Sequence, residues 1–218
     1  MQIANDKFPK ERNGLITGSK CSILFPDKGD GKAGQLTYAK QLAIQLYFNY
    51  FESGGNWQTE HGDMNEHSAF EFYKSNYDFS CEKGSFVQNG DYGGSSDALC
   101  DSHGVDFKCP TTLEKWVDYL FVGIDKQQYH QCQMYMWLFN KPMWKVAIYL
   151  TETKWMDDTE QQYPVPQNQR MIIVEVAKKE GWENELIEKG QFVIEQRDLL
   201  TDKLKENFSA LNTQIDML

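Results

Sequence analysis

The sequence predicts an α/β or α+β fold with a central mixed β-sheet flanked by helices. Segments whose apolar residues recur at spacings of three and four, as on one face of a helix, alternate with short apolar runs of strand length. Turn signals separate several short runs between residues 77 and 110, which indicates antiparallel strands. With 218 residues the chain can bury a sizeable core, and we expect a single domain over residues 1–218.

The first expected elements are two helices, over residues 34–51 and 61–76, because each segment carries apolar residues on one side. Three short strands follow, over residues 85–88, 92–100 and 105–110. The remaining elements are expected in this order: helices over 112–123 and 126–139, buried strands over 144–150 and 170–177, and a long amphipathic helix over 178–217 that is broken or softened at Gly190.

Composition and charge narrow the function classes. The formal net charge of −10 argues against coating of nucleic acid by bulk electrostatics, but residues 1–40 are locally basic and leave room for a local DNA site. No apolar run approaches the roughly 18 residues of a membrane span, and residues 1–14 lack a signal peptide's apolar core, so we expect a cytoplasmic protein. The five cysteines include no C-x-x-C spacing, which favours free thiols over a disulfide framework or a metal cluster.

Residues 93–110 place Asp97, Asp106 and Lys108 in a predicted β-hairpin, although strands are usually depleted in Asp and Lys. If residues 101–104 form the loop, Asp97 lies opposite Lys108, and strand alternation puts all three side chains on one face. Carboxylates hold Mg²⁺ and a neighbouring lysine orients or activates an attacking water, so the three residues predict a nuclease site. The alternative is an exposed hairpin with a surface salt bridge, worth only about 0–1 kcal/mol.

Four short motifs follow one another between residues 12 and 150. They are RNGLITGS at 12–19, HGDMNEHSAFEFY at 61–73, SSDA followed by DFKCP at 95–110, and YHQCQMYMW at 129–137. Together they resemble the PD-(D/E)XK nucleases, and specifically the lambda-exonuclease (YqaJ-like viral recombinase) family. The resemblance implies a restriction-endonuclease-like core over about residues 12–150, with a further strand and a long helix over residues 170–217.

The resemblance assigns roles in a metal site. Asp97 and Asp106 would be the metal-binding carboxylates, with the backbone carbonyl of Phe107 as an extra ligand. Lys108 would be the catalytic lysine. Glu66 matches a helix glutamate that such sites use for metal or water, although a solvated glutamate is the default reading of that position.

The helix at 129–137 supplies a further assignment, and the strand motif departs from the family pattern at two positions. Gln131 matches the family glutamine that positions the active-site lysine or water, with Gln133 as its companion; otherwise both are polar residues on an outer helix face. The usual Pro-Asp becomes Ser96-Asp97, and the usual Glu-x-Lys has Asp106 in place of glutamate. The second metal ligand is therefore one methylene shorter.

The resemblance also implies a pocket for the 5′-phosphate of the strand being cut. Arg12 is the only arginine in the first 169 residues, and its rigid fork suits bidentate phosphate recognition. The family uses an arginine and two serines, which match Arg12, Ser19 and Ser95. Ser95 lies two residues before Asp97, so on one continuous strand the two would share a face. Without the motif, Arg12 reads as a solvated residue of the N-terminal segment.

The expected function is a Mg²⁺-dependent exonuclease, with Mn²⁺ as a substitute ion, that digests double-stranded DNA 5′ to 3′ and leaves a 3′ single-stranded tail for recombination. The implied partners are DNA ends, a single-strand-annealing recombination protein and further copies of the chain, with a trimer expected and no membrane. The implied setting is a bacterial or phage-infected host cell. The alternatives are an endonuclease or end-processing nuclease on the same core, and a non-catalytic DNA-end-binding protein.

Overall fold

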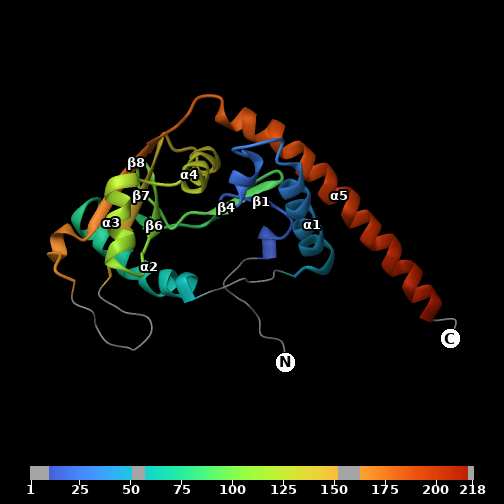
Figure 1. Ribbon diagram of the computed structural model, residues 1–218, viewed down its shortest axis with the longest axis horizontal. Helices are drawn as coiled ribbons and strands as arrows, with labels where there is room; N and C mark the ends of the chain where they lie inside the picture. The colour runs from blue at the N-terminus through green and yellow to red at the C-terminus, as the bar shows by residue number, and fades with distance from the viewer. Residues whose placement is uncertain (1–9, 51–56, 152–162, 216–218) are drawn as a thin grey trace. The chain divides into compact units, whose positions relative to one another are not determined.

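A computed structural model of the chain describes residues 10–50, 57–151 and 163–215 (Figure 1). The expected helical character of Phe51 and of residues 216–217 lies outside these ranges. The described residues divide into two compact units. The first contains residues 10–50, 88–94 and 181–215, and the second contains residues 57–87, 95–151 and 163–180. The expectation of one domain stays a prediction.

Two helices, α1 (Lys32–Phe48) and α5 (Trp182–Ile215), pack against each other in the first unit. Short 3₁₀ helices, η1 (Lys10–Arg12) and η2 (Cys21–Leu24), and the strand β1 (Ile16–Thr17) precede α1. Arg197 of α5 is only 6% exposed. It donates to the Gly14 carbonyl at 2.9 Å and to the Asp91 carboxylate at 2.8 Å, so one buried guanidinium ties α5 to two distant segments.

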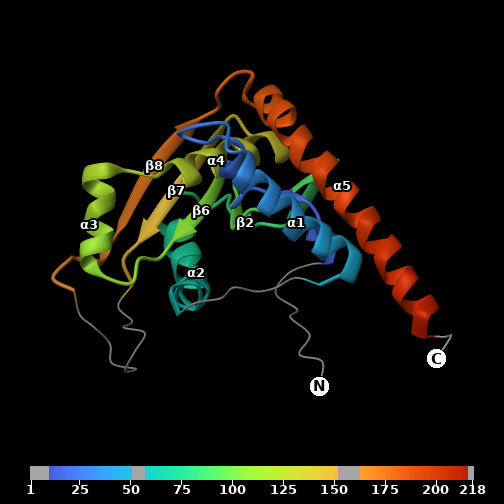
Figure 2. The same ribbon diagram turned by 45° about the vertical axis from the view of Figure 1, so that its right-hand side comes forward.

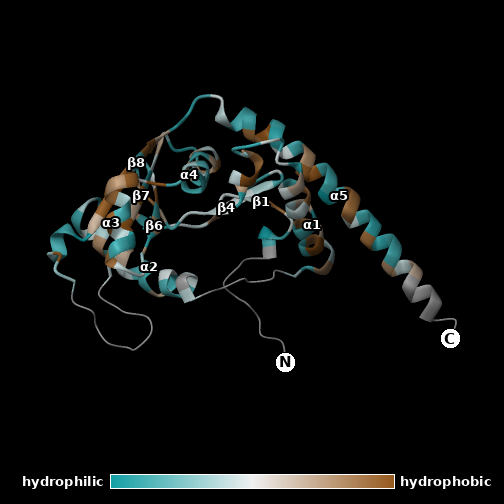
Figure 3. Ribbon diagram, in the orientation of Figure 1, coloured by the Kyte–Doolittle hydropathy of each residue, from teal (hydrophilic) through white to brown (hydrophobic). Residues whose placement is uncertain are grey.

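The helix α5 runs without interruption through Gly190, so the predicted break is wrong. Hydrophobic residues recur in bands along it (Figure 3), as expected for an amphipathic helix. A methyl group at Gly190 would collide with the hydroxyl of Tyr92, which donates to the carbonyl of Leu186 at 3.4 Å. The glycine therefore permits a close approach of Tyr92 to the helix rather than a change of its direction.

The structure contains two mixed sheets in its described residues. The smaller has the order β1-β4-β3, in which β4 (Tyr92–Ser95) runs parallel to β1 and borders β3 (Phe86–Asn89). The larger belongs to the second unit and has the order β2-β5-β6-β7-β8. Its strands are β2 (Glu82–Lys83), β5 (Ala98–Leu99), β6 (Gly104–Lys108), β7 (Met143–Tyr149) and β8 (Met171–Ala177).

Only β6 and β7 pair in parallel in the larger sheet, and its other pairs are antiparallel. The chain crosses between the two parallel strands through α3 (Leu113–Val122) and α4 (Lys126–Leu138), as a parallel pair requires. The helix α2 (Trp57–Asn76) precedes the sheet, and a 3₁₀ turn, η3 (Gln167–Gln169), leads into β8. The predicted α/β class with a helix-flanked mixed sheet is confirmed.

Helices cover both faces of the sheet in the second unit (Figure 2). Side chains alternate along β6, and Val105 and Phe107 join an apolar cluster with residues of α2. Asp106 and Lys108 point to the opposite face, where Gln131 of α4 donates to Asp106. The strand β6 is therefore apolar toward α2 and carries its charged residues on the α4 side.

The β5–β6 hairpin has a tighter turn than the sequence predicted. Ala98 pairs with Val105, and the Cys100 amide donates to the His103 carbonyl at 2.9 Å. The turn therefore contains residues 101 and 102 rather than residues 101–104. The predicted pairing of Cys100 with Val105 is wrong by two residues.

This register changes the partner of Asp97. Extending it by one pair puts Asp97 opposite Asp106, and not opposite Lys108 as predicted. Because the shift is two residues and strand side chains alternate with a period of two, the three residues keep a common face. The predicted strand at 92–100 is also interrupted: β4 ends at Ser95 and β5 begins at Ala98 in the other sheet, so alternation does not relate Ser95 to Asp97.

Two of the five cysteines form a disulfide, Cys81 with Cys100, so the expectation of free thiols is wrong for this pair. Cys81 directly precedes β2 and Cys100 directly follows β5, and the antiparallel pairing of these strands places the two residues opposite each other. Nothing in the local spacing signalled the pair, because 19 positions separate the two cysteines. Cys21, Cys109 and Cys132 are outside disulfides. In residues 10–50, 57–151 and 163–215, no helix combines the length and apolarity of a membrane span.

Candidate active site

A cleft of about 530 Å³ in the second unit is bordered by α2, β6, α3 and α4. All five predicted side chains of the metal and catalytic site line this cleft: Glu66, Asp97, Asp106, Lys108 and Gln131. The SSDA and DFKCP segments and the helices α2 and α4 therefore converge on one cavity.

Asp106 is at the centre of this arrangement and is only 3% exposed. One carboxylate oxygen accepts from Lys108 Nζ at 2.7 Å, and the other accepts from Gln131 Nε2 at 2.9 Å. Gln131 is also 3.3 Å from the hydroxyl of Tyr135, one helical turn further along α4. Both oxygens of Asp106 thus have a donor, which fixes the orientation of a buried carboxylate.

The start of α4 explains how Gln131 reaches the site. Asp125 caps the helix by accepting from the Gln128 amide at 2.7 Å, and the Gln128 side chain accepts from the Asp125 amide at 2.9 Å. The Gln128 side chain also donates to the Tyr119 hydroxyl of α3 at 2.9 Å. These bonds fix the helix start, and Gln131 follows within the next turn.

Asp97 is held from two directions just before β5. Its carboxylate accepts from the backbone amide of Phe107 at 2.7 Å, and its carbonyl accepts from the Gly84 amide at 3.0 Å. Burial, together with the nearby charge of Asp106, raises the pKa of Asp97 well above its ordinary value. The folded chain therefore brings together two carboxylates that repel each other in the absence of a cation.

The other titratable groups of the cleft respond to the same surroundings. Burial raises the pKa of Glu66, and the carboxylates of Asp63 and Asp106 add to this effect. Burial disfavours the charged form of Lys108, but the charges of Asp106 and Asp97 outweigh it and raise the pKa of the ammonium above its ordinary value. Lys108 is therefore protonated at neutral pH.

Cys109, which follows Lys108, also lines the cleft. Burial, with the charges of Glu66 and Asp97 nearby, raises the pKa of its thiol to about 12. The thiol is therefore protonated at neutral pH and is not an activated nucleophile.

Gln133 does not join the site, although the sequence paired it with Gln131. Its side chain donates to the Ala177 carbonyl at 2.8 Å and accepts from the Lys179 amide at 2.9 Å, so it stabilises the end of β8. Residues two apart on a helix point in different directions, which separates the two glutamines. Both are buried, so neither lies on an outer helix face.

The cleft contains residues that sequence reasoning missed. Tyr135 contacts Gln131, and Lys115, Asp118 and Tyr119 of α3 line the cavity. Two signals were present in the sequence. Tyr135 lies four residues after Gln131, on the same helix face. The helix α3 begins five residues after Lys108, so its first turns must lie close to the end of β6.

The expected phosphate residues are divided between the two units. Arg12, in η1, and Ser19 are half-buried residues of the first unit, and Ser95 belongs to the second. Ser19 Oγ lies 3.5 Å from the hydroxyl of Thr17. The 5′-phosphate pocket therefore stays a prediction.

The donor set of the cleft fits a hard divalent cation. Asp97 and Asp106 supply carboxylate oxygens, with Glu66 on the adjacent helix, and Mg²⁺ is usually bound through one or two carboxylates together with substrate phosphate oxygens. Burial and the charge of Asp106 disfavour the ionised form of Asp97 and raise its pKa. A bound cation would favour that ionised form.

No protein-family model and no curated protein matches this sequence. Among solved structures, the alkaline exonuclease LHK-Exo from Laribacter hongkongensis matches with a TM-score of 0.75 and 16% identity, over 95% of this chain and 100% of that chain. LHK-Exo in complex with dAMP matches with a TM-score of 0.71 and 15% identity, over the same shares of both chains. A phage related exonuclease from Haemophilus somnus 129PT matches with a TM-score of 0.63 and 18% identity, over 89% and 96% of the two chains. The chain thus has the fold of these exonucleases, consistent with the resemblance to the lambda-exonuclease family.

Proposed function

We propose that this protein is a metal-dependent exonuclease that hydrolyses double-stranded DNA from 5′ ends and leaves a 3′ single-stranded tail for recombination. The observation that carries the proposal is the convergence of Asp97, Asp106 and Lys108 in one cleft, in a chain with the fold of alkaline and phage exonucleases. An arbitrary surface hairpin would not bury Asp106 or fix both of its oxygens.

Mg²⁺, or Mn²⁺ in its place, would be held by Asp97 and Asp106, with Glu66 and the carbonyl of Phe107 as further proposed ligands. When bound, the ion supplies Lewis-acid polarisation of the scissile phosphate and lowers the pKa of a water. Gln131 fixes the orientation of the Asp106 carboxylate by donating to it at 2.9 Å.

Lys108 has an electrostatic role in this proposal. Its ammonium is protonated at neutral pH and is held 2.7 Å from Asp106, so in the resting cleft it is a hydrogen-bond donor and not a proton acceptor. A fixed positive charge beside the scissile phosphate stabilises the negative charge that develops during attack, and its donors orient the attacking water.

A time course on end-labelled linear duplex, with and without Mg²⁺, tests the activity. We expect Mg²⁺-dependent release of nucleotides from the 5′ end by wild type and no release by Lys108→Ala. Covalently closed circular DNA in the same buffer is the control: cutting of the circle would identify an endonuclease. End binding without nucleotide release would identify a non-catalytic DNA-end-binding protein.

The 5′-phosphate pocket has its own test. Arg12→Ala should slow digestion of 5′-phosphorylated duplex by about ten- to a hundredfold, because loss of a charge-assisted hydrogen bond costs about 1.5–3 kcal/mol. Wild type should prefer 5′-phosphoryl over 5′-hydroxyl ends, and the variant should lose most of that preference. Equal discrimination by both proteins would remove Arg12 from the phosphate site.

A ring is proposed for the assembly, because an acidic protein that holds DNA processively gains by enclosing it with its less acidic faces. We propose a homotrimer that works beside a single-strand-annealing recombination protein. Light scattering at micromolar concentration should give the trimer mass. An active monomer in the same buffer would remove the ring.

A further inference from the structure

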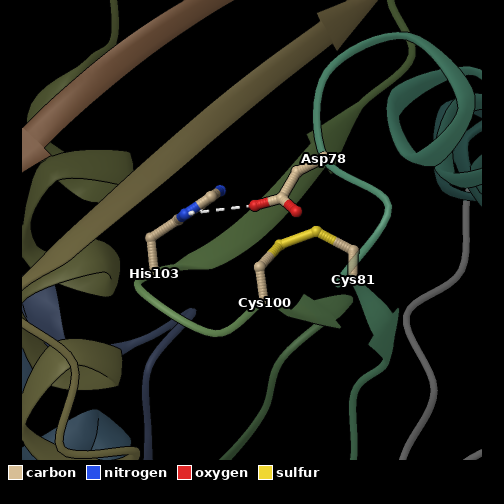
Figure 4. A group of neighbouring side chains, drawn as sticks. All are labelled: Asp78, Cys81, Cys100 and His103. Atoms are coloured by element: carbon tan, nitrogen blue, oxygen red, sulfur yellow. Dashed lines mark ion pairs between the residues drawn. A yellow bond between two sulfur atoms is a disulfide. The ribbon is translucent and has the colours of Figure 1, made fainter.

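A second cluster of chemically active side chains lies at the turn end of the hairpin, at the opposite end from the metal-binding carboxylates. We name it the turn cluster, and its members are Asp78, Cys81, Cys100 and His103. The candidate ligand atoms of these four residues all lie within 4.8 Å of one another. Figure 4 shows Asp78 and His103 pointing toward each other beside the disulfide.

The spacing of the turn cluster is that of a zinc site. It consists of two short motifs, D-x-x-C at 78–81 and C-x-x-H at 100–103, and structural zinc sites commonly draw ligand pairs from such two-residue separations. Each pair is closed by a backbone hydrogen bond, from the Cys81 amide to the Asp78 carbonyl at 3.4 Å and from the Cys100 amide to the His103 carbonyl at 2.9 Å. The strand pairing of β2 with β5 then brings the two motifs face to face.

The Asp78 carboxylate is already oriented as a ligand. One oxygen accepts from the Ser80 amide at 2.9 Å and from the Ser80 hydroxyl at 2.7 Å. The other oxygen lies 3.9 Å from His103 Nδ1. In a tetrahedral zinc site, nitrogen and oxygen ligands about 2.0–2.1 Å from the ion are roughly 3.3 Å apart, so a movement of about half an ångström suffices.

His103 has the supporting hydrogen bond that metal-bound histidines use. It is only 2% exposed, and its Nε2 lies 2.8 Å from the hydroxyl of Tyr73, which is fully buried. If Nε2–H donates to Tyr73, the lone pair is on Nδ1, which then accepts from the Ser102 hydroxyl at 3.0 Å and lies 3.9 Å from the Asp78 carboxylate. A zinc ion bound at Nδ1 would therefore replace the hydrogen bond from Ser102. Outer hydrogen bonds like the one to Tyr73 fix the tautomer and the orientation of a ligating imidazole.

Charge and burial also suit a thiolate site. Cys81 and Cys100 are buried, and Lys141 Nζ donates to the Cys100 carbonyl at 2.7 Å and to the Asp101 carbonyl at 3.0 Å. Two thiolates and one carboxylate around Zn²⁺ leave a formal charge of −1. A lysine ammonium next to that charge offsets part of the cost of burying it.

We propose that the turn cluster binds one Zn²⁺ when its disulfide is reduced. A dithiol or phosphine reductant supplies two electrons to the sulfur–sulfur bond, two protons complete the thiols, and the reductant is oxidised. Zinc binding then displaces both thiol protons, and the two sulfurs separate to about 3.8 Å around the ion. The disulfide and the zinc ion are alternative links between the same two motifs, one for oxidising and one for reducing conditions.

The site has a structural role in this proposal. It joins the segment before β2 to the turn between β5 and β6, and Asp97 lies only three residues before Cys100. Either link holds the turn end of the hairpin whose opposite end presents the carboxylates of the cleft. The inference does not depend on the proposed nuclease activity, because it concerns metal binding alone.

The test uses a Cys109→Ser background, because Cys109 lines the other cleft and its sulfur would confuse a spectroscopic signal. The full chain is reduced with a phosphine, the reductant is removed without air, and the thiols are counted before Co²⁺ is added as the probe. We expect one equivalent to give a thiolate-to-cobalt charge-transfer band that Zn²⁺ abolishes. The oxidised chain should give no band.

Three further variants test whether the metal is bound by the turn cluster and not by the cleft. Tyr73→Phe keeps the ring packing and should weaken zinc binding by about ten- to a hundredfold. Cys100→Ser should lose the charge-transfer band, whereas Asp97→Asn should keep it, because it changes the other site. Absence of the band in the reduced chain, or its persistence in Cys100→Ser, would overturn the proposal. Failure of Zn²⁺ to raise the melting temperature of the reduced chain would also overturn it.

Discussion

Asp97→Asn and Asp106→Asn should both abolish cleavage, yet only Asp106→Asn should lower the stability of the metal-free protein. Both changes are nearly isosteric, and each removes one negative charge from the cleft. The charge of Asp106 is compensated by Lys108 at 2.7 Å. The charge of Asp97 is disfavoured by burial and by Asp106. Asp106→Asn therefore removes the partner of the Lys108 charge, whereas Asp97→Asn leaves the ion pair between Asp106 and Lys108 in place.

The expected magnitude follows from the ion pair. Two charges 2.7 Å apart attract by about 6 kcal/mol at an effective dielectric constant of about 20. Desolvation of both groups offsets most of this, and Lys108 is still 31% exposed, so solvent screens the pair. We expect Asp106→Asn to cost about 1.5–3 kcal/mol, the usual range for a hydrogen bond to a charged group. Asp97→Asn should leave the stability unchanged or raise it.

The pH dependence has a definite sign. A carboxyl with a higher pKa in the folded than in the unfolded chain makes the folded state less stable as pH rises from the ordinary carboxyl pKa of 3.8 through the folded-state pKa. Below pH 3.8 both states are protonated and the effect disappears. Any gain in stability from Asp97→Asn should therefore be present at neutral pH and absent in acid.

The assay is denaturant and thermal unfolding in excess chelator, at neutral pH and in acid, for wild type and both variants. For a chain of this size, each 1 kcal/mol corresponds to a change of about 2–4 °C in melting temperature. Equal destabilisation by the two variants at neutral pH would refute the reasoning, because it would mean that the charge of Asp97 is as well compensated as that of Asp106.

Three further predictions test the roles that the structure gives to two glutamines, the disulfide and two helix glycines. Gln131→Leu should slow cleavage by about ten- to a hundredfold with the fold retained, which steady-state rates will show. Gln133→Leu should lower the free energy of unfolding by about 1–3 kcal/mol in denaturation, with full activity per folded molecule. Under oxidising conditions without added metal, Cys100→Ser should cost about 3 kcal/mol in denaturant unfolding, because it opens the disulfide loop; an unchanged midpoint would contradict this. Gly190→Ala should destabilise the protein by about 1–3 kcal/mol, because the added methyl group collides with the Tyr92 hydroxyl. Gly34→Ala, at an open helix position, should stabilise it by about 0.5–1 kcal/mol. The opposite ranking in calorimetry would contradict this account of the packing.

Local patterns in the sequence were enough to predict most of the helices and strands of this fold. The spacing of apolar residues predicted helices close to the observed α1 and α2, and the apolar runs after residue 140 predicted β7 and β8. The out-of-place charges of Asp97, Asp106 and Lys108 marked the site, and the motif order added Glu66 and Gln131. These features are readable because helix and strand periodicity and residue chemistry act over a few positions.

Only the tertiary structure decided which groups meet. A two-residue turn, rather than the four-residue loop predicted from the sequence, placed Asp97 opposite Asp106 instead of opposite Lys108. The pairing of β2 with β5 brought Cys81 to Cys100 across 19 positions. Such contacts depend on strand register and on the closure of long loops, which follow from packing of the whole unit. The sequence by itself therefore determined which residues are candidates for the chemistry, and the fold determined how those residues are paired.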